Sequence, residues 1–245
     1  MTFGAFADWT WEMIDNERFD YYNNVFTFDT LNCFDQSTPH TITLAAGPTS
    51  DVGDSSVIRK INPGTLVFAA SNFLKGGLQV EGGTVRVSAN QGSGLGPATV
   101  ASGATLEVVS GGVLRNSSVT VADGGTLALA DGGTTVSNAV TLEEGATLDI
   151  QSFTSRSAEA ASVVALSATG RATVRLSGTL PDSVFSTGTN FVIAASCDAA
   201  TLANISLDKS GLLFENAGNC SNARLNVDGG KLVVSVKPYF YIKVR

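Results

Sequence analysis

The stretch from Val100 to Ile150 contains one nine-residue pattern written three times. The copies begin at Val100, Val121 and Leu142, so they recur at a constant interval. A fixed period of about 20 residues is the signature of a solenoid, in which each repeat is one structural unit that stacks on the next. This repeat constrains the fold more than any other feature of the chain.

Each copy has the form apolar, two turn residues, Gly, small, Thr, apolar, polar, apolar. The second half alternates with a period of two, which predicts a strand with Leu106 and Val108 on one face. The glycine suits a tight corner, because it adopts backbone angles that strain other residues. A strand, a corner and a second strand in every repeat predict an all-β, right-handed parallel β-helix (β-solenoid) with rungs of about 21 residues.

Stacking places equivalent residues of successive rungs about 4.8 Å apart. We expect three buried apolar columns: Val100, Val121 and Leu142; Leu106, Leu127 and Leu148; and Val108, Leu129 and Ile150. An outward ladder is expected from the threonines at 65, 84, 105, 126 and 147. No single rung can bury its own apolar face, so the stack is the unit of stability.

Composition limits the class of protein and its partners. The 245 residues are 43% hydrophobic, which is enough for a core and argues against global disorder. The net charge of −7 and the lack of a Lys/Arg run argue against nucleic acid or an anionic membrane surface as the main partner. No apolar run reaches the ~18 residues of a membrane helix. Met1 to Asp8 lack the features of a signal peptide, so the protein is either cytoplasmic or a fragment of a longer protein, and we expect a fragment.

The regular pattern occupies the middle of the chain. We expect residues 1–55 to form an N-terminal cap or the tail of an upstream unit, 56–150 the regular rungs, and 151–245 irregular β rungs and a C-terminal cap. Near the end, Asp228–Gly230 predict a hairpin or corner turn between two strands. The last seven residues, Tyr239–Arg245, alternate and would suit a strand that covers the open end.

The three cysteines allow one disulfide. Cys197 and Cys220 are close enough in sequence that they could bridge, which would leave Cys33 over. The alternative is three buried thiols, and the odd count favours it.

Residues 61–85 contain in order a Gly-Thr-Leu strand, an Asn-aromatic corner, a Gly-Gly turn, a Val strand and a second Gly-Thr strand. With the Gly92–Gly96 corner and the strand that follows, about residues 58–150 resemble the autotransporter-associated β-strand repeat, also called the passenger-associated transport repeat. The resemblance implies a β-helical bacterial protein that is extracellular or on the cell surface, associated with the outer membrane. It also implies that the repeats stack as a stalk and help export.

Few residues suggest chemistry. His40 is the only histidine, and no acidic residue stands at useful spacing from it, so we expect an ordinary surface or corner histidine. The cysteines lack a C-x-x-C pair, which argues against a metal site. Gly92–Gly96 lacks the G-x-G-x-x-G spacing of a nucleotide loop. Three glycosylation sequons begin at Asn116, Asn204 and Asn219, and the bacterial resemblance makes them uninformative.

Two acidic columns are expected from the stacking. One would place Asp123 below Glu144 with Ser102 a rung earlier, and the other would contain Glu107 and Asp149. Carboxylate clusters serve β-helix lyases and hydrolases, sometimes with calcium. However, two solvated charges about 4.8 Å apart repel by no more than about 1 kcal/mol in water, so a corner tolerates them without a metal. The repeats also carry no aromatic residue between Phe73 and Phe153 to hold a sugar.

We therefore predict no catalytic residue, no cofactor-binding residue, no metal ligand and no cofactor. The expected function is a non-enzymatic structural stalk of an autotransporter-passenger-like protein, with a contribution to adhesion. The alternative is a carbohydrate-active or glycan-binding parallel β-helix. The partner stays open: surface glycans, or proteins of host or neighbouring cells, are the candidates, with no nucleic acid and no membrane-spanning segment.

Overall fold

The structure of this chain is a computed structural model. It describes residues 2–5, 7–11, 25–32, 34–45, 55–72, 75–130, 135–151, 161–215 and 218–237. The fold is mostly β, with 58% strand and 5% helix, in agreement with the predicted all-β class. The predicted final strand over 239–245 and the thiol of Cys33 lie outside the described residues.

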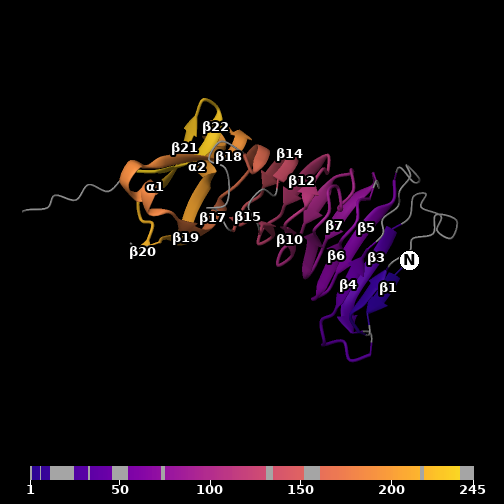
Figure 1. The fold of residues 1–245 in the computed structure, drawn as a ribbon. Coiled ribbons are helices and arrows are strands. Elements are labelled where there is room, and N and C mark those ends of the chain that lie inside the picture. The colour runs from indigo at the N-terminus through magenta and orange to yellow at the C-terminus, as the bar shows by residue number, and fades with distance from the viewer. Residues whose placement is uncertain are drawn as a thin grey trace, which may run out of the picture.

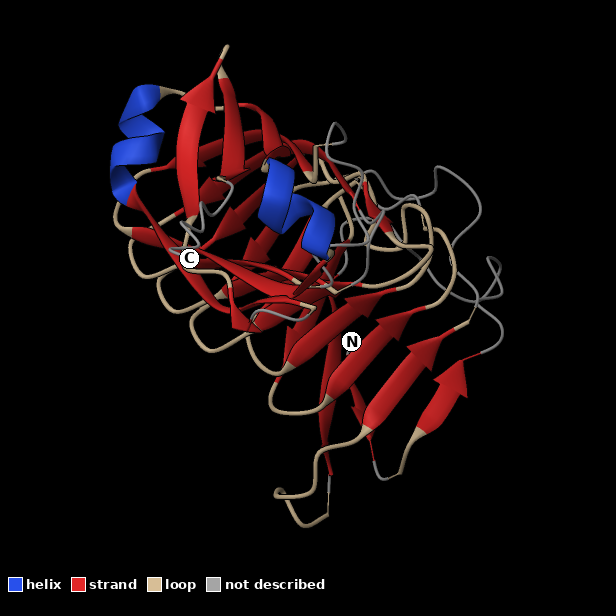
Figure 2. Cartoon of the chain, turned by 60° about the vertical axis from the view of Figure 1, so that its left-hand side comes forward, coloured by secondary structure: helices blue, strands red, loops and turns tan. Residues whose placement is uncertain are grey.

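The strands form two sheets (Figures 1 and 2). The larger sheet contains, in spatial order, β1 (Thr2–Ala5), β3 (Val25–Asn32), β5 (Val57–Ile61), β7 (Gly77–Val80), β9 (Ala98–Val100), β12 (Ser118–Val121), β14 (Thr135–Leu142), β16 (Val163–Ala168), β18 (Thr189–Ser196), β22 (Lys231–Val236) and β21 (Ala223–Asp228), with β11 (Val113–Leu114) beside β14. The smaller sheet contains β2 (Trp9–Trp11), β4 (Thr41–Leu44), β6 (Thr65–Phe68), β8 (Thr84–Val87), β10 (Thr105–Val108), β13 (Thr126–Leu129), β15 (Thr147–Ile150), β17 (Ala172–Leu180), β19 (Ile205–Phe214) and β20 (Gly218–Asn219).

Strands that follow one another in the chain lie mostly in different sheets, so the chain passes back and forth between the two. Neighbours in the larger sheet are parallel from β1 to β18, and neighbours in the smaller sheet are parallel from β2 to β19. Figure 1 shows the result as an elongated stack, with the N-terminal strands at one end and β19 to β22 at the other.

The register of the sheets confirms the predicted columns. In the smaller sheet Leu106 is opposite Leu127, which is opposite Leu148. In the larger sheet Val100 is opposite Val121, which is opposite Leu142. All of these side chains are fully buried, as are Val108, Leu129 and Ile150. The core therefore runs along the stack between the two sheets, built from period-two strands whose apolar faces point toward each other.

The threonine ladder is also confirmed. Each of its residues is paired in register with the next, in the order Thr65, Thr84, Thr105, Thr126 and Thr147. The corners before three of these threonines contain glycine with a positive φ, at Gly103 (+72°), Gly124 (+69°) and Gly145 (+76°). An L-residue in that region is strained, which explains why the pattern requires glycine there.

The number of residues between one register-matched position and the next increases after β15. Thr147 is opposite Thr173, which is opposite Ser206, so each of these steps is longer than the step from Thr126 to Thr147. Two short helices, α1 (Asp182–Thr187) and α2 (Ala199–Asn204), occupy part of the added length. The carboxylate of Asp198 caps α2 by accepting a hydrogen bond from Thr201 N at 2.7 Å.

The last strands reverse direction. β22 pairs antiparallel with β18, β21 pairs antiparallel with β22, and β20 pairs antiparallel with the end of β19. The turn predicted at Asp228–Gly230 joins β21 to β22 as a hairpin, with Asp228 opposite Lys231. The parallel stack therefore ends in antiparallel elements.

Candidate functional site

A shallow groove on the outer face of the larger sheet is the candidate site that the regular rungs form. Its volume is about 350 Å³, and its polar lining comes from Gln79, Thr99 and Thr120 on adjacent strands and from Glu81 and Glu143 at the following corners. Gln79, Thr99 and Thr120 are in register, so they repeat about every 4.8 Å. We call this surface the threonine groove. It offers an amide, hydroxyls and carboxylates to an extended polar ligand, and none of its lining residues is aromatic.

The carboxylates of the threonine groove do not form a catalytic pair. Glu81 follows Val80 at the end of β7, and Glu143 follows Leu142 at the end of β14. Val80 and Leu142 belong to the same column, three strand spacings apart. That separation is about 14 Å. Glycosidase carboxylates lie about 5–9.5 Å apart. Glu81 is also engaged by Arg59, whose Nε and Nη2 donate at 2.8 and 2.5 Å, and this contact raises the pKa of Arg59.

The predicted acidic corner is solvent-exposed. Ser102, Asp123 and Glu144 are all exposed, and none of them lines the threonine groove. The Asp123 carboxylate lies over the corner of the next rung, where a Cβ added to Gly145 would be 1.9 Å from Oδ1. Within the described ranges, no three His, Cys, Asp or Glu residues are grouped so that they could hold a metal ion.

The second acidic column is confirmed, and arginines accompany it. Glu107 is opposite Ala128, which is opposite Asp149. Arg86 Nε contacts Glu107 Oε2 at 2.6 Å, and Arg175 lies 3.8 Å from Asp149.

Beyond Asp149 the same column continues to Arg175 and Asp208, which are in contact at 3.3 Å. The pKa of Asp208 is lowered mainly by a hydrogen bond from the backbone of Ser210, with a smaller effect of Arg175. Exposed ion pairs of this kind contribute about 0–1 kcal/mol each. Each carboxylate of this column therefore lies close to an arginine, and the column is not a cluster of free carboxylates.

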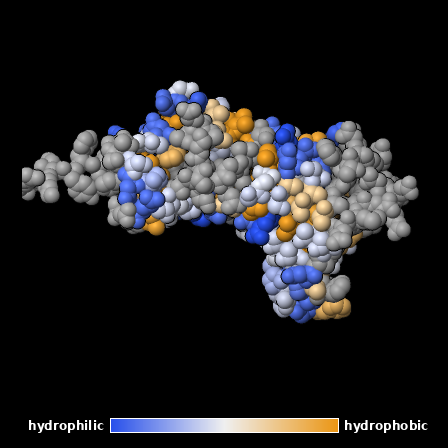
Figure 3. All heavy atoms as spheres, viewed as in Figure 1, coloured by the Kyte–Doolittle hydropathy of each residue, from blue (hydrophilic) through white to orange (hydrophobic). Residues whose placement is uncertain are grey.

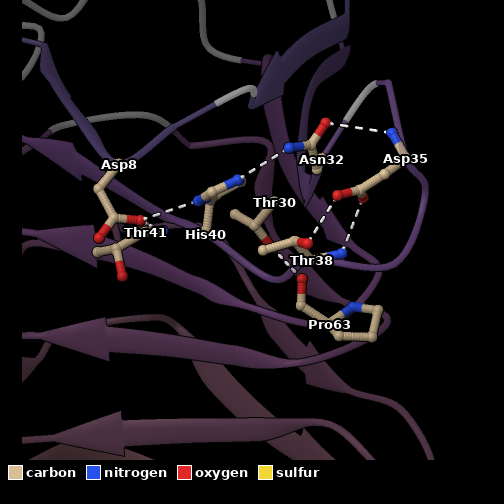
Figure 4. Close-up of polar contacts among 8 residues, drawn as sticks. All are labelled: Asp8, Thr30, Asn32, Asp35, Thr38, His40, Thr41 and Pro63. Carbon is tan, nitrogen blue, oxygen red and sulfur yellow. Dashed lines mark hydrogen bonds and ion pairs between the residues drawn. The ribbon is translucent and has the colours of Figure 1, made fainter.

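His40 has an acidic neighbour that sequence spacing did not reveal (Figure 4). Its Nδ1 lies 3.3 Å from Asp8 Oδ1, although the two residues are 32 positions apart. The expectation of no useful acidic neighbour is therefore wrong. Asp8 Oδ1 also accepts from Thr41 N at 2.7 Å, and that hydrogen bond is the main reason why the pKa of Asp8 is lowered. The carboxylate joins the start of β2 to the start of β4.

The other side of the His40 ring faces an amide and not a nucleophile. Asn32 Nδ2 lies 3.2 Å from His40 Nε2. With the proton on Nδ1, the ring donates to Asp8 and accepts from Asn32, so both nitrogens are used. An Asp-His pair is present, but the position that a serine or cysteine would occupy in a triad is filled by Asn32.

The same network shapes the loop between β3 and β4. Asn32 Oδ1 accepts from Phe34 N at 2.8 Å, and Asp35 Oδ1 accepts from Ser37 N and Thr38 N at 2.8 and 2.9 Å. Hydrogen bonds from the side chain and backbone of Thr38 lower the pKa of Asp35 to about 2. The loop projects from the stack in Figure 1 and presents Phe34, which is 84% exposed. The exposed Phe34 ring is a second surface available for contact.

Lys60 is a buried ionisable residue that the sequence analysis did not identify. It occupies a core column of the larger sheet, opposite Phe28 on one side and Val80 on the other, and is fully buried. Its Nζ donates to the carbonyls of Ile61, Asn62 and Gly82 at 2.9, 2.5 and 2.8 Å. Burial lowers the pKa of Lys60 to about 8, against an opposing effect of Asp29. The alternation of Ile58 and Lys60 was the signal that could have placed this lysine inside.

The cysteines and one sequon have structural roles. Cys197 and Cys220 are free buried thiols, so the alternative in which they bridge is wrong, and burial raises the pKa of each.

Asn116, the first residue of a sequon, is 1% exposed. Its amide donates to the carbonyls of Ser93 and Gly96 at 3.2 and 2.8 Å, so it stabilises a corner and is inaccessible to a glycan.

The visible surface carries no single dominant patch. Figure 3 shows hydrophilic and hydrophobic residues interspersed over the described part of the face that it presents. In the described part of the chain, no helix has the length and apolarity needed to cross a membrane. Comparisons with protein-family models, with curated proteins and with solved structures find no match.

Proposed function

We propose that this chain is a non-enzymatic structural stalk, built as a right-handed parallel β-helix with rungs of about 21 residues in its regular part. We infer further that it belongs to a secreted or surface-exposed bacterial protein similar to autotransporter passengers. The observation that carries the proposal is the continuous parallel pairing from the N-terminal strands to β18 and β19, interrupted only by local register shifts, with apolar residues inside at each step.

The physical basis is that such a stack is a spacer. Each inner strand is hydrogen-bonded on both sides, and each inner rung buries its apolar face against two neighbours. Length is added at about 4.8 Å per rung without any change in cross-section. A protein of this shape separates its two ends by a fixed distance, which is what a stalk requires.

The polar residues support a role without catalysis. Glu81 and Glu143 are too far apart for paired acid and base chemistry. His40 uses both ring nitrogens in hydrogen bonds, and Glu107 is paired with an arginine. The exposed Phe34 and the threonine groove are surfaces through which the stalk would contribute to adhesion.

Two measurements test this proposal. Antibodies against the chain should label intact cells of the source bacterium, and labelling only after cell lysis would contradict a surface location. The purified chain should release no oligosaccharide from pectin-like or host glycans. Release that is lost in Asp123→Ala or Glu144→Ala would replace the stalk by a carbohydrate-active enzyme.

Glycan binding without catalysis is the second candidate, and the threonine groove favours it. Its hydroxyls repeat at the spacing of the rungs, which suits an extended chain of sugar hydroxyls. The double variant Thr99→Val, Thr120→Val removes two hydroxyls at nearly constant shape. A glycan-array signal that the natural chain gives and this variant loses would support the groove, and an array without hits would exclude this candidate.

A further inference from the structure

The side chain of Asn32, the last residue of β3, connects the only histidine of the chain to the loop that presents Phe34 (Figure 4). Its Nδ2 lies 3.2 Å from His40 Nε2. Its Oδ1 accepts from Phe34 N and Asp35 N at 2.8 and 3.3 Å. The amide group therefore stands between the histidine ring and the backbone of the loop.

The loop determines which way the Asn32 amide points. A backbone N–H can only donate, so the Asn32 atom that faces Phe34 N and Asp35 N is the oxygen. The atom that faces His40 Nε2 is then the NH2 group, which also can only donate. This contact is a hydrogen bond only while His40 Nε2 carries no proton.

Protonation of His40 disrupts this arrangement on one side of the ring. The imidazolium ion carries a proton on each nitrogen, so both Nδ1 and Nε2 become donors. On the Nδ1 side Asp8 Oδ1 lies 3.3 Å away, and the hydrogen bond from Thr41 N lowers the pKa of that carboxyl, which keeps it ionised as an acceptor. On the Nε2 side, two donors face each other across 3.2 Å.

Among the described residues, Asp8 is the charged partner of the His40 ring. The other charged side chains of the neighbouring elements are each engaged elsewhere: Asp29 and Asp35 accept from backbone N–H groups, Arg59 pairs with Glu81, and Lys60 donates to carbonyls. Asn32 is therefore the side chain that has to respond when Nε2 gains a proton.

We propose that protonation of His40 turns the Asn32 amide over and thereby loosens the part of the loop that carries Phe34. After the turn, Oδ1 accepts from His40 Nε2, and Phe34 N and Asp35 N lose their acceptor. The Asp35 carboxylate keeps its hydrogen bonds from the backbone of residues 37 and 38, so the second half of the loop retains its turn. Histidine changes charge between about pH 5 and pH 8, so acid is the signal.

The consequence concerns how the exposed Phe34 ring is presented. With neutral His40 the ring stands on an ordered loop, and ordering in advance lowers the entropic cost of a contact. With protonated His40 that advantage is lost, so any contact made through Phe34 should weaken in acid. The inference concerns the loop alone and does not require the proposed stalk.

NMR spectroscopy tests the coupling in the full chain, because His40 gives the only histidine ring signal. Between about pH 8 and pH 5, the amide protons of Phe34 and Asp35 should move upfield, since each loses a hydrogen bond, with the same midpoint as the His40 ring. Unchanged amides of β13 report that the chain stays folded. Loop amides that do not follow the ring, or a ring that gains no proton in this range, would overturn the proposal.

Two variants separate the turning of the amide from the direct effect of a nearby charge. Asn32→Asp offers two acceptor oxygens, one for Phe34 N and one for protonated His40, so no turn is needed. Its loop amides should shift far less than those of the natural chain while the ring still titrates. Shifts as large as in the natural chain would contradict the proposal, because the amides would then sense only the charge. His40→Gln removes the titration and should leave the signals of the loop amides constant.

Discussion

The regular rungs over 57–150 and the C-terminal part over 161–237 use the same two sheets in different ways. In the regular part the smaller sheet advances by equal steps through Thr84, Thr105, Thr126 and Thr147, and each strand is parallel to both neighbours. In the C-terminal part the step from Thr173 to Ser206 is longer, helices enter the corners, and β20 to β22 are antiparallel. Extending the stack and ending it therefore depend on different structural elements.

An inner rung is buried from both sides, whereas the last rung has a neighbour on only one side. Leu127 lies between Leu106 and Leu148 and is fully buried, but Leu207 has only Val174 in register among the described residues. The end needs other elements to cover its apolar residues and its free strand edge. Helix α2 and the β21–β22 hairpin provide part of that cover.

The largest expected effect comes from truncating the inner column. Leu127→Ala should destabilise the chain by about 3–5 kcal/mol, because a fully buried leucine leaves a cavity between two fixed neighbours. Leu207→Ala removes the same atoms at the partly buried end and should cost about 1–2 kcal/mol. Urea denaturation followed by circular dichroism measures both. Equal losses of stability would mean that Leu127 and Leu207 are packed equally well.

The corners provide the second contrast. Gly83 has φ +63°, and a Cβ there would lie 2.4 Å from the Gly64 carbonyl oxygen of the preceding rung. Gly229, in the terminal hairpin, has φ +56° and nothing within 4 Å. Both alanine variants carry the cost of a left-handed residue, about 1–2 kcal/mol. Only Gly83→Ala also forces two rungs apart, which adds about 1–3 kcal/mol.

The difference between these two variants isolates the stacking, because the backbone strain is common to both. We expect Gly83→Ala to lower the urea midpoint clearly more than Gly229→Ala. If Gly229→Ala proved the more damaging, the hairpin and not the stacked corner would limit stability.

The regular part could be predicted from the sequence because its information is local and repeated. Five threonines and three sets of apolar residues determined the register, since a slip of one residue would turn every apolar side chain outward. The predicted hairpin at Asp228–Gly230 was likewise carried by local turn residues. These features needed no knowledge of distant parts of the chain.

The features that escaped prediction depend on contacts distant in sequence or on exceptions to a pattern. Asp8 meets His40 only because β2 and β4 are adjacent in the smaller sheet. Cys197 and Cys220 have a suitable spacing for a bridge, yet spacing alone does not bring two sulfur atoms together. Lys60 follows the inward parity of its strand, but a lysine is rarely fully buried, so parity and residue type gave opposite indications.

At pH 7 the smallest expected effect is that of replacing Lys60, which tests whether the regular core depends on a wholly apolar column. Its pKa is about 8 in the folded chain, because burial disfavours the charge, and 10.5 is its ordinary value. Between these two pH values the unfolded chain binds more protons than the folded chain, so stability should rise with pH. The slope for one group is at most about 1.4 kcal/mol per pH unit.

The variant Lys60→Met keeps the length of the side chain and removes the titration. Urea denaturation from pH 7 to pH 10.5 should therefore show a rise in the natural chain that is absent or smaller in the variant, while other titrating groups contribute equally to both. At pH 7 the variant loses three hydrogen bonds to carbonyls but no longer buries a charge, so its stability should differ little from that of the natural chain. Parallel curves across the whole range would show that Lys60 keeps its proton in the core, and that its three carbonyl acceptors stabilise the ammonium group as well as water does.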